Sequence, residues 1–593
     1  MPQLNELILK YALQNSVKFD GKPNIGAVIG KLISEDAALK SKIAEVQKEI
    51  KKVIAEISKL SVEEQLAKLQ EIAPELLEKK EKKKRELPEL PGAVEGKIKD
   101  FVTRIPPEPS KYAHIGHALS FLLNYMYAKK YNGRCIMRFE DTNPETCKQE
   151  YVDAMIEDVT KYLEIKPDRI FKVSEDMDKF YEFGEKLVAS GNAFVCFCAR
   201  ENMQELRHNG KECACRKKKT SENLEAWHEM LAGNYEDGVC VLRLKGDMEA
   251  LNHVMRDPVL FRISRQKHYS LGEKYFVWPM YDFENAVEDS LSNTTHILRS
   301  NEFGSMRVEL QDYIKKLLGF SNQINVEYGR FAINGTTTKG REIRDLIEKK
   351  EVAGWDDPRL VTLKAMKRRG FLKETFYELA VEVGLTPSPT NLDWSIVESV
   401  NRKFLDPVVH RHFFVEDPVE IKIENAPNQE VELNLHPENK KGGRKFSTHD
   451  LFYVAKKDFE ELNVPGLYRL MDCANFTNDK KSGNNEIDGN LNNTFLYHSH
   501  EYEQYKNDEK SMNKKIMHWL PADDENKKKL FDVEVLMSDG SIKTGFGEES
   551  LKHVKVGEII QFERFGFCKL EKIEKESKSV VSNSKLSFIW THK

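Results

Sequence analysis

Two histidines that could bind phosphate follow a proline-rich segment. Residues 104–110 (RIPPEPS) lead to His114, Gly116 and His117, and an amphipathic run comes next. Histidines three residues apart share one face of a helix's first turn, where unpaired backbone amides and the positive end of the helix dipole attract phosphate. Gly116 would leave room for a ligand beside the backbone. This pattern predicts an ATP site that stabilises charge on the α-phosphate during adenylyl transfer; two capping or core histidines are the alternative.

Four cysteines form a second candidate site. They are Cys196, Cys198, Cys213 and Cys215, two Cys-x-Cys pairs separated by fourteen residues. Four thiolates in two close pairs suit tetrahedral zinc, and a reduced intracellular protein would rarely use them as disulfides. The one-residue spacing is shorter than the usual spacing of zinc ligands, so reduced cysteines that bind no metal are the alternative. The basic residues 216–219 beside them would either contact RNA or form a solvated loop.

The composition limits the class of protein. The chain has 593 residues, which at ~100–200 residues per domain predicts several domains. Hydrophobic residues make up 40% of the chain, so wholesale disorder is excluded. No run reaches the ~18 apolar residues of a membrane span, and the N-terminus lacks the pattern of a signal peptide. Nine cysteines, an odd number, do not indicate a disulfide framework. We therefore expect a soluble, reduced, cytoplasmic protein without membrane partners; its net charge of −4 neither requires nor excludes nucleic acid.

The first 92 residues have the pattern of a helical N-terminal domain. Apolar residues at alternating spacings of four and three over residues 39–60 predict a long helix with one narrow apolar seam. Ser61 and Glu64 form a capping-box pattern that predicts a second helix towards Ala73. The charge run at residues 79–85, followed by prolines, predicts a linker.

The elements that must position the histidines belong to an α/β region. An apolar strand at residues 101–105, a helix from about Gly116 to the Asn-Gly at 132–133 and a strand at 135–139 form a βαβ unit, which implies a parallel sheet. Further on, Asp357 as N-cap with Pro358 at the first helical position predicts a helix that ends at Gly370.

After about residue 405 the pattern becomes all-β and is typical of barrels. Alternating or apolar runs predict strands at residues 419–423, 431–435, 533–536, 559–562 and 586–590. Asp539-Gly540 predicts a hairpin turn after the third of these. Residues 477–493, which have almost nothing to bury, predict a mobile insertion.

The order of these motifs resembles class I aminoacyl-tRNA synthetases, and specifically their glutamyl and glutaminyl branch. The resemblance covers nearly the whole chain and is closest to glutamyl-tRNA synthetases of the archaeal and eukaryotic type. The segments that carry it are residues 104–117, 138–144 (RFEDTNP), 281–283, 295–299 (THILR), 354–360 (GWDDPRL), 557–567 and 590–593, with residues 11–15 and 26–31 at the start.

The resemblance implies a domain plan. A Rossmann-like catalytic domain would span residues 98–345, with an inserted region at about 190–275 that meets the tRNA acceptor stem and carries the cysteine cluster. A helical connector would span 346–404, and a β-barrel anticodon-binding region 405–593. The connector's basic residues Lys364, Lys367, Arg368 and Arg369 would support the inner bend of the tRNA.

The resemblance also implies the binding residues. ATP would contact Pro107, His114, Gly116 and His117. Glutamate carries two carboxylates and one ammonium, so its pocket needs two cationic donors and one anion; Arg104 and Arg299 fit the first requirement and Glu140 the second. Arg299 and Ser110 match the glutamyl enzymes, because glutaminyl enzymes typically have Cys and Asn at these positions. Family analogy adds as further contacts Glu108, Tyr281 and Asn285. The alternative is surface arginines in ordinary salt bridges.

Two positions depart from the family pattern. Lys111 replaces the usual Gly before the histidines, which predicts crowding of that turn. The loop at residues 334–342 replaces the second ATP motif, which contains a lysine that reaches the leaving pyrophosphate. Lys339 matches that lysine only if Gly340 is an insertion; without a gap, Gly340 takes the lysine position and Arg341 must supply the charge.

The predicted function is the ATP-dependent attachment of L-glutamate to tRNA(Glu) through a glutamyl-adenylate, with Mg²⁺ at the phosphates. Three alternatives remain: a glutaminyl enzyme, a shortened glutamyl enzyme that modifies a tRNA base, and a non-catalytic tRNA-binding scaffold. The N-terminal helical domain is a candidate contact for other synthetases or a scaffold. The sequence leaves open the oligomeric state, the residues that read the anticodon, whether tRNA(Gln) is also charged, and which arginine binds the side-chain carboxylate.

Overall fold

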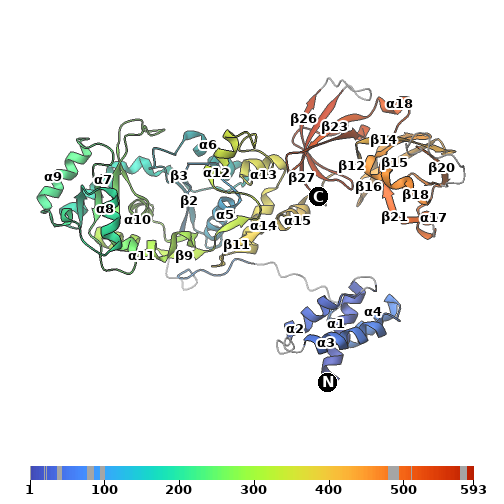
Figure 1. Ribbon diagram of the computed structural model, residues 1–593, viewed down its shortest axis with the longest axis horizontal. Helices are drawn as coiled ribbons and strands as arrows, with labels where there is room; N and C mark the ends of the chain where they lie inside the picture. The colour runs from blue at the N-terminus through green and yellow to red at the C-terminus, as the bar shows by residue number, and fades with distance from the viewer. Residues whose placement is uncertain are drawn as a thin grey trace. The chain divides into compact units, whose positions relative to one another are not determined.

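The chain divides into two compact units, residues 1–86 and 87–593, which are described separately (Figure 1). The computed structural model describes residues 2–18, 21, 23–35, 43–76, 86–93, 100–478, 493–508, 511–574 and 584–593. The predicted linker at 79–85 and most of the predicted insertion at 477–493 lie outside the described residues. No described helix is long and apolar enough to cross a membrane.

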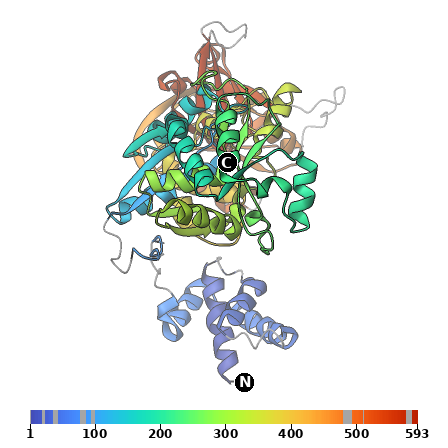
Figure 2. The same ribbon diagram turned by 90° about the vertical axis from the view of Figure 1, so that its left-hand side faces the viewer.

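The first unit is a bundle of helices around one apolar core (Figure 2). Its α-helices are α1 (Pro2–Lys18), α2 (Ile25–Glu35), α3 (Ile43–Ile57) and α4 (Val62–Ile72). The seam predicted for α3 is buried at Val46, Ile50 and Ile57. The predicted capping box opens α4, because Ser61 Oγ accepts the Glu64 amide at 3.2 Å and a Glu64 carboxylate oxygen accepts the Ser61 amide at 2.8 Å.

A parallel sheet begins the second unit and confirms the predicted βαβ pattern. Strand β1 (Val102–Ile105) leads through α5 (Ile115–Lys130) to β2 (Arg134–Phe139), which pairs in parallel with β1 and with β3 (Arg169–Lys172). On the other side of β1 lies β8 (His296–Ser300), joined by a hydrogen bond from the Thr295 amide to the Val102 carbonyl at 3.0 Å. All four strands therefore direct their carboxyl ends towards the N-terminus of α5.

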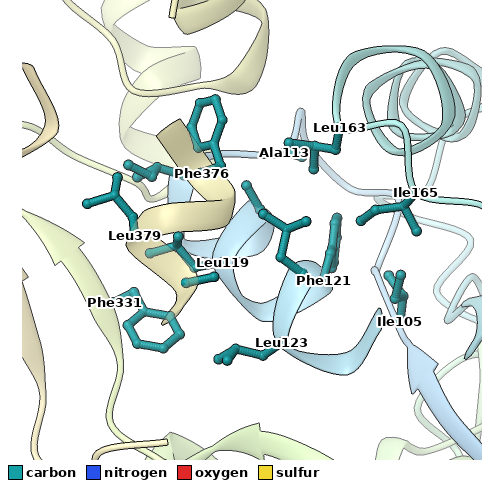
Figure 3. Packing of buried hydrophobic residues seen from close by; sticks show 14 of the residues in the cluster. Ile105, Ala113, Leu119, Phe121, Leu123, Leu163, Ile165, Phe331, Phe376 and Leu379 are labelled. Atoms are coloured by element: carbon teal, nitrogen blue, oxygen red, sulfur yellow. The ribbon is translucent and has the colours of Figure 1, made fainter. Parts of the chain in front are cut away.

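Helix α5 lies in the largest core of this unit (Figure 3). Its apolar residues pack in one cluster with residues from distant parts of the chain, including Ile105, Ile165, Phe331, Phe376 and Leu379. The remaining elements around this sheet are α6 (Gln149–Glu157), α10 (Tyr281–Leu291), α11 (Gly304–Leu318), β9 (Ile324–Tyr328), β10 (Phe331–Ile333), α12 (Gly340–Glu348) and β11 (Thr390–Leu392). This packing fixes the first turn of α5 against β10.

A second core lies mainly in the segment between β3 and β8 and also includes apolar residues of α11. Its four-stranded antiparallel sheet has the order β4 (Ala193–Cys196), β5 (Val241–Leu244), β6 (Val259–Ile263) and β7 (Val277–Pro279). Helices α7 (Met177–Ala189), α8 (Arg200–His208) and α9 (Thr220–Leu231) accompany it, and Trp227 and Trp278 are fully buried in its core.

The predicted start of the connector helix was wrong. Helix α13 (Leu363–Arg369) begins after Thr362, whose hydroxyl accepts the Ala365 amide at 3.1 Å. Asp357 instead accepts the Arg359 Nε at 2.7 Å and the Ala353 amide at 2.8 Å, so it closes the preceding loop. The predicted end was correct, because Gly370 has a left-handed backbone with φ +94°. Two further connector helices are α14 (Lys373–Val383) and α15 (Trp394–Leu405).

Residues 411–592 form mainly β-structure, as predicted. One seven-stranded sheet has the order β12 (Arg411–His412), β25 (Ile559–Phe562), β26 (Gly566–Glu574), β27 (Lys585–His592), β23 (Phe531–Leu536), β24 (Ile542–Gly547) and β13 (Phe414–Glu416). The other has the order β21 (Ser511–Met517), β18 (Leu467–Leu470), β19 (Ala474–Thr477), β20 (Thr494–Ser499), β14 (Pro418–Glu424), β17 (Leu451–Ala455) and β22 (Trp519–Pro521). The hairpin β15 (Gln429–His436) and β16 (Asn439–Thr448) pairs separately, and short helices are α16 (Lys456–Glu460), α17 (Tyr502–Asn507) and α18 (Asp524–Lys527).

Candidate active site

A cavity of about 680 Å³ opens where β1, β2 and β8 end and α5 begins. It brings together residues that are more than two hundred positions apart in the sequence, from Arg104 to Phe331. The predicted site residues that line it are Arg104, Pro107, Glu108, His114, Gly116, His117, Glu140, Tyr281 and Arg299. Three predicted residues, Asn285, Lys339 and Arg341, do not line it.

Backbone amides fix the tautomer of both histidines at the start of α5. The His114 amide donates to His117 Nδ1 at 3.2 Å, and the Gly116 amide donates to His114 Nδ1 at 3.1 Å. Because each Nδ1 accepts, a neutral ring must carry its proton on Nε2. Burial and the nearby Lys111 cation lower the pKa of His117 to about 3, and burial with the charges of His117 and Lys111 lowers that of His114 well below its usual range. Both rings are therefore neutral Nε2–H donors at neutral pH.

Gly116 lines the cavity and also permits a close contact within the chain. A Cβ atom on this residue would lie 3.0 Å from the Phe331 carbonyl oxygen and 3.0 Å from the His114 ring. The glycine therefore lets α5 approach the backbone of β10 and lets the His114 ring fold back over the helix start. The close approach is to the chain itself, although Gly116 also lines the cavity.

Two arginines that line the cavity leave part of their hydrogen-bonding capacity unused among the described residues. Arg104 donates from Nε to Asp289 at 2.8 Å, while its buried Nη1 has no hydrogen-bond partner among the described residues. Arg299 donates from Nη1 to Gln311 at 3.0 Å, and within the same described part of the chain its buried Nε and Nη2 have no partner. A buried unpaired donor is costly. These atoms therefore indicate a ligand with oxygen acceptors, such as carboxylates.

A buried charge network supports the two arginines. Asp289 accepts both Arg104 Nε and Arg138 Nη1 at 2.8 Å. Burial alone would raise the pKa of Asp289, but the two guanidinium groups hold it below its usual range. Arg138 also donates to Glu140 and to the Asn285 side-chain oxygen, each at 3.0 Å. Asn285, predicted to contact glutamate, therefore holds Arg138 from behind, whereas Glu140 reaches the cavity.

Acidic side chains gather on the same wall of the cavity. Glu108, Glu140 and Glu284 all line it. Burial and the Glu140 charge raise the pKa of Glu108, and the same two causes raise the pKa of Glu284 well above its usual range. Glu140, whose negative charge raises both pKa values, is the carboxylate best suited to attract an ammonium group.

The loop predicted to hold the second ATP motif lies beside a smaller cavity of about 410 Å³. Lys339 lines this cavity, has a side chain 67% exposed and pairs with Glu342 at 2.8 Å. Arg341 is exposed at the start of α12 and lines neither cavity. Arg330 lines both cavities and donates to Glu302 at 2.7 Å.

Several lining residues were missed by sequence reasoning. Arg330 precedes β10, and Arg262 lies in β6, whose position beside the cavity depends on the tertiary fold. Gln311, which orients Arg299, lies on α11 and carries no signal of its role in its spacing. Lys111 was noted only as a departure from a pattern, yet it lines the cavity.

The four cysteines meet at one point, away from the cavity. Their sulfur atoms all lie within 4.8 Å of one another, with Cys196–Cys213 at 3.8 Å and Cys198–Cys215 at 3.9 Å. Buried Arg243 donates from Nη1 to the sulfurs of Cys196 and Cys213, each at 3.6 Å. Four sulfurs bound at ~2.3 Å to a tetrahedral zinc would lie ~3.8 Å apart, so the cluster fits this ion.

Three of the four connector residues predicted to support the tRNA bend also make contacts within the protein, whereas Lys364 is exposed. Lys367 pairs with Glu157 at 2.9 Å, and Arg368 pairs with Glu571 at 2.6 Å. Arg369 is buried, and its Nη2 donates to the Thr591 carbonyl at 2.7 Å across 222 residues of sequence. The contacts of Arg368 and Arg369 join α13 to the β-region, and that of Lys367 joins it to α6.

Comparison with known proteins identifies the family. Residues 100–407 match the family described as tRNA synthetases class I (E and Q), catalytic domain, and residues 409–497 and 516–571 match its two anticodon-binding domain families. A glutamate–tRNA ligase of Pyrococcus furiosus is 37% identical over 604 residues, which cover 100% of both chains.

Two other archaeal relatives agree. The glutamate–tRNA ligase of Methanobrevibacter smithii is 34% identical over 596 residues, covering 100% of both chains. That of Nitrosopumilus maritimus is 36% identical over 580 residues, covering 96% of this chain and 97% of that chain. With its catalytic and anticodon-binding regions both matched, the chain belongs to the class I tRNA synthetases of the glutamate and glutamine group, among the glutamate–tRNA ligases of archaeal type.

Proposed function

We propose that this protein joins L-glutamate to tRNA(Glu) at the expense of ATP, the reaction of its family. The observation that carries the proposal is the cavity itself. At one end it has two neutral histidine donors at a helix N-terminus. Near β1 and β8 it has two buried arginines with unused N–H groups. One end suits phosphate and the other suits a dicarboxylic amino acid.

The ATP phosphates, which enter as the Mg²⁺ complex, would lie at the start of α5. There the free Nε2–H groups of His114 and His117 can donate to the α-phosphate as negative charge builds on it. Neutral donors in a fixed tautomer need no proton transfer and little reorganisation during the step, which is what makes such groups effective. Pro107 and Gly116 would shape the same wall.

Glutamate would lie between the arginines and the acidic wall. Arg104 and Arg299 would each hold one carboxylate, and Glu140 and Glu108 would face the ammonium group. Tyr281, also at the cavity wall, would flank the side chain. Asn285 would act through Arg138 rather than by touching the substrate.

Two steps follow. An oxygen of the glutamate α-carboxylate attacks the α-phosphorus of ATP, the bond to the β-phosphate oxygen breaks, and pyrophosphate leaves. A ribose hydroxyl of the terminal tRNA adenosine then attacks the carbonyl carbon of the adenylate. AMP departs, and the glutamyl group is left as an ester on the tRNA. The protein's part in both steps is to position the groups and to stabilise the charge that develops.

Discrimination against glutamine would rest on the second arginine. A neutral amide in place of the side-chain carboxylate would leave one buried guanidinium without a charged partner, and such a loss is severe. The glutaminyl reaction is therefore the weaker candidate, and tRNA(Gln) as a second acceptor for glutamate remains to be tested.

The remaining regions would bind tRNA. We assign the acceptor end to the inserted region at about 190–275 and the anticodon arm to the β-region after residue 405. We propose domain limits at 1–92, 98–345, 346–404 and 405–593. We also propose that the protein is cytoplasmic and that its N-terminal helices contact other proteins.

The cysteine cluster would hold one structural zinc ion. The sulfur separations described above fit a tetrahedral site, and the Arg243 guanidinium would offset part of the charge of four thiolates. When bound, zinc would supply a cross-link between β4 and the segment at 213–217. Elemental analysis should find about one zinc per chain, and Cys198→Ser should release it. Protein free of zinc with unchanged melting behaviour would refute this assignment.

The decisive experiment for the function is aminoacylation with glutamate and with glutamine, each on separate tRNA(Glu) and tRNA(Gln). We expect glutamate on tRNA(Glu) to be the strongest combination. Charging with glutamine alone would identify a glutaminyl enzyme. No charging by folded protein would favour a non-catalytic tRNA-binding scaffold.

A further inference from the structure

The two departures from the family pattern touch each other. Lys111 replaces the family's Gly, and Gly340 stands at the family's lysine position in the ungapped alignment. A Cβ atom on Gly340 would lie 2.9 Å from Lys111 Cδ and 3.0 Å from Lys111 Cβ. Lys111 Nζ donates to the Thr338 carbonyl at 3.2 Å. The Lys111 side chain thus fills the space that a side chain at position 340 would need.

Lys111 lies where a phosphate-binding cation is useful. It lines the main cavity together with His114 and His117. Its charge helps to lower the pKa of both histidines, so its ammonium group is close enough to interact electrostatically with phosphates bound beside them. Burial lowers the pKa of Lys111 itself, while the Glu108 charge opposes this shift.

Four other cations near the loop pair with a carboxylate or lie outside the main cavity; one of them, Arg344, donates to the Ser110 carbonyl at 3.1 Å and lines neither cavity. Lys339 pairs with Glu342 beside the smaller cavity, Arg341 lines neither cavity, and Arg330 pairs with Glu302. Among the described residues Lys111 makes no ion pair within 4.0 Å, and its Nζ donates to the neutral Thr338 carbonyl. It can therefore leave this acceptor for an anion at little electrostatic cost.

We propose that Lys111 supplies the cation that the family places in the second ATP motif. The absence of a side chain at Gly340 leaves the space that the Lys111 side chain occupies. The positive charge that the family carries on the loop is, in this chain, carried by Lys111 in the turn before α5. During adenylate formation the Lys111 ammonium would leave the Thr338 carbonyl and donate to the β- and γ-phosphate oxygens that become pyrophosphate. The inference rests on the proposed function and adds a residue to its machinery.

The first test separates charge from packing. Lys111→Met keeps the aliphatic chain over Gly340 and removes the charge, whereas Lys111→Arg keeps a charge. In tRNA-dependent pyrophosphate exchange we expect a loss of about 100-fold for Lys111→Met and a much smaller loss for Lys111→Arg. The matched control is Lys129→Met at the far end of α5, which should change the rate by less than about threefold. Lys339→Ala should also cost about threefold or less, because its ion pair is exposed.

The second test moves the charge back. Lys111→Gly should be slow, and Gly340→Lys alone should also be slow because the new side chain meets Lys111. The double variant restores the family arrangement and should recover at least about tenfold over Lys111→Gly. No positive φ constrains Gly340, so its backbone admits a lysine.

Two results would overturn the inference. One is an exchange rate for Lys111→Met close to that of the unmodified protein, and the other is a double variant no faster than Lys111→Gly. In each case charging of tRNA(Glu) by the unmodified protein is measured in parallel. If that charging is present, only the role of Lys111 fails; if it is absent, the proposed function fails.

Discussion

At the scale of residues, the histidine pair shows how backbone geometry sets chemistry. The His114 amide occupies His117 Nδ1, which leaves Nε2–H as the group that His117 presents to the cavity. With a pKa of about 3 in the absence of substrate, this ring is neutral throughout the pH range of ordinary assays.

We therefore predict that His117→Ala lowers tRNA charging at least ~100-fold without unfolding the protein, because one transition-state donor is lost. Initial rates of charging and the thermal melting curve check this together. A folded variant with an unchanged turnover would remove His117 from the site.

A second prediction concerns Arg299, whose Nε and Nη2 have no partner among the described residues. Arg299→Cys should reduce kcat/KM for glutamate by about 10- to 150-fold, since a charge-assisted hydrogen bond contributes ~1.5–3 kcal/mol. The KM for ATP should change far less.

The same variant can identify which carboxylate Arg299 holds. If Arg299 holds the side-chain carboxylate, Arg299→Cys should lower the ratio of kcat/KM for glutamate to kcat/KM for glutamine. If Arg104 holds that carboxylate, Arg104→Ala should lower this ratio instead. Unaltered glutamate kinetics in Arg299→Cys would overturn the pocket.

Most of these residues could be predicted from local motifs, but their immediate neighbours could not. His114 and His117 sit three residues apart, and their spacing alone predicts a shared face. Gln311, which orients Arg299, acts through a contact that only the packing of α11 creates. The same holds for Asn285, which was predicted to contact glutamate, because its side-chain oxygen accepts a hydrogen bond from Arg138.

At the scale of elements, local signals succeeded where they had no competitor. Ser61 and Glu64 form the expected capping box, and no other side chain of the described residues is hydrogen-bonded to either of them. Asp357 had the right type for an N-cap, yet the Arg359 side chain and the Ala353 amide engage its carboxylate. Thr362, five residues later, caps the helix instead. The sequence pattern therefore identifies residues that could cap a helix, but tertiary contacts determine which of them does so.

Glu548 links several elements of the β-region and gives a prediction about acid. Its carboxylate accepts the Phe413 amide at 2.6 Å and Arg444 Nη2 at 2.7 Å, and it faces His412 Nδ1 at 3.3 Å. Burial would raise its pKa, but Arg444 and His412 lower it to about 2.

Because this pKa is depressed, the stabilising effect of Glu548 is complete above its unfolded pKa of about 4.5 and disappears as the pH falls towards 2. Its loss corresponds to about 3 kcal/mol. Glu548→Gln should lower the melting temperature at pH 7 and flatten the decline in acid. The control is Glu549→Gln, which removes only an exposed pair with Lys552. The prediction would be contradicted if the melting temperature of Glu548→Gln fell with decreasing pH by as much as that of the unmodified protein.

At the scale of the whole molecule, the order of regions was predictable because each has its own periodicity. Helical spacing, alternation of strand and helix, and then short alternating strands follow one another along the chain. The cavity was not predictable in this way, because it combines residues from 104 to 331 whose proximity depends on the packed sheet.

Every residue that lines the cavity belongs to the second unit. We therefore predict that a chain of residues 87–593 forms the adenylate at a rate within about threefold of the full chain. Pyrophosphate exchange measures this step, and a filter assay for tRNA binding shows whether the first unit acts there instead. Loss of exchange in a folded truncated chain would assign residues 1–86 a part in catalysis.

The buried contact between Arg369 and Thr591 has a consequence for synthesis. Arg369 leaves the ribosome 222 residues before the carbonyl that it binds. At about 5–20 residues per second, translation of this stretch takes about 10 to 45 s. For that time the guanidinium and the apolar faces of Trp394 and Phe371 around it have no cover from β27. The connector would therefore wait tens of seconds for this partner, and it is a segment of the nascent chain on which a chaperone would act.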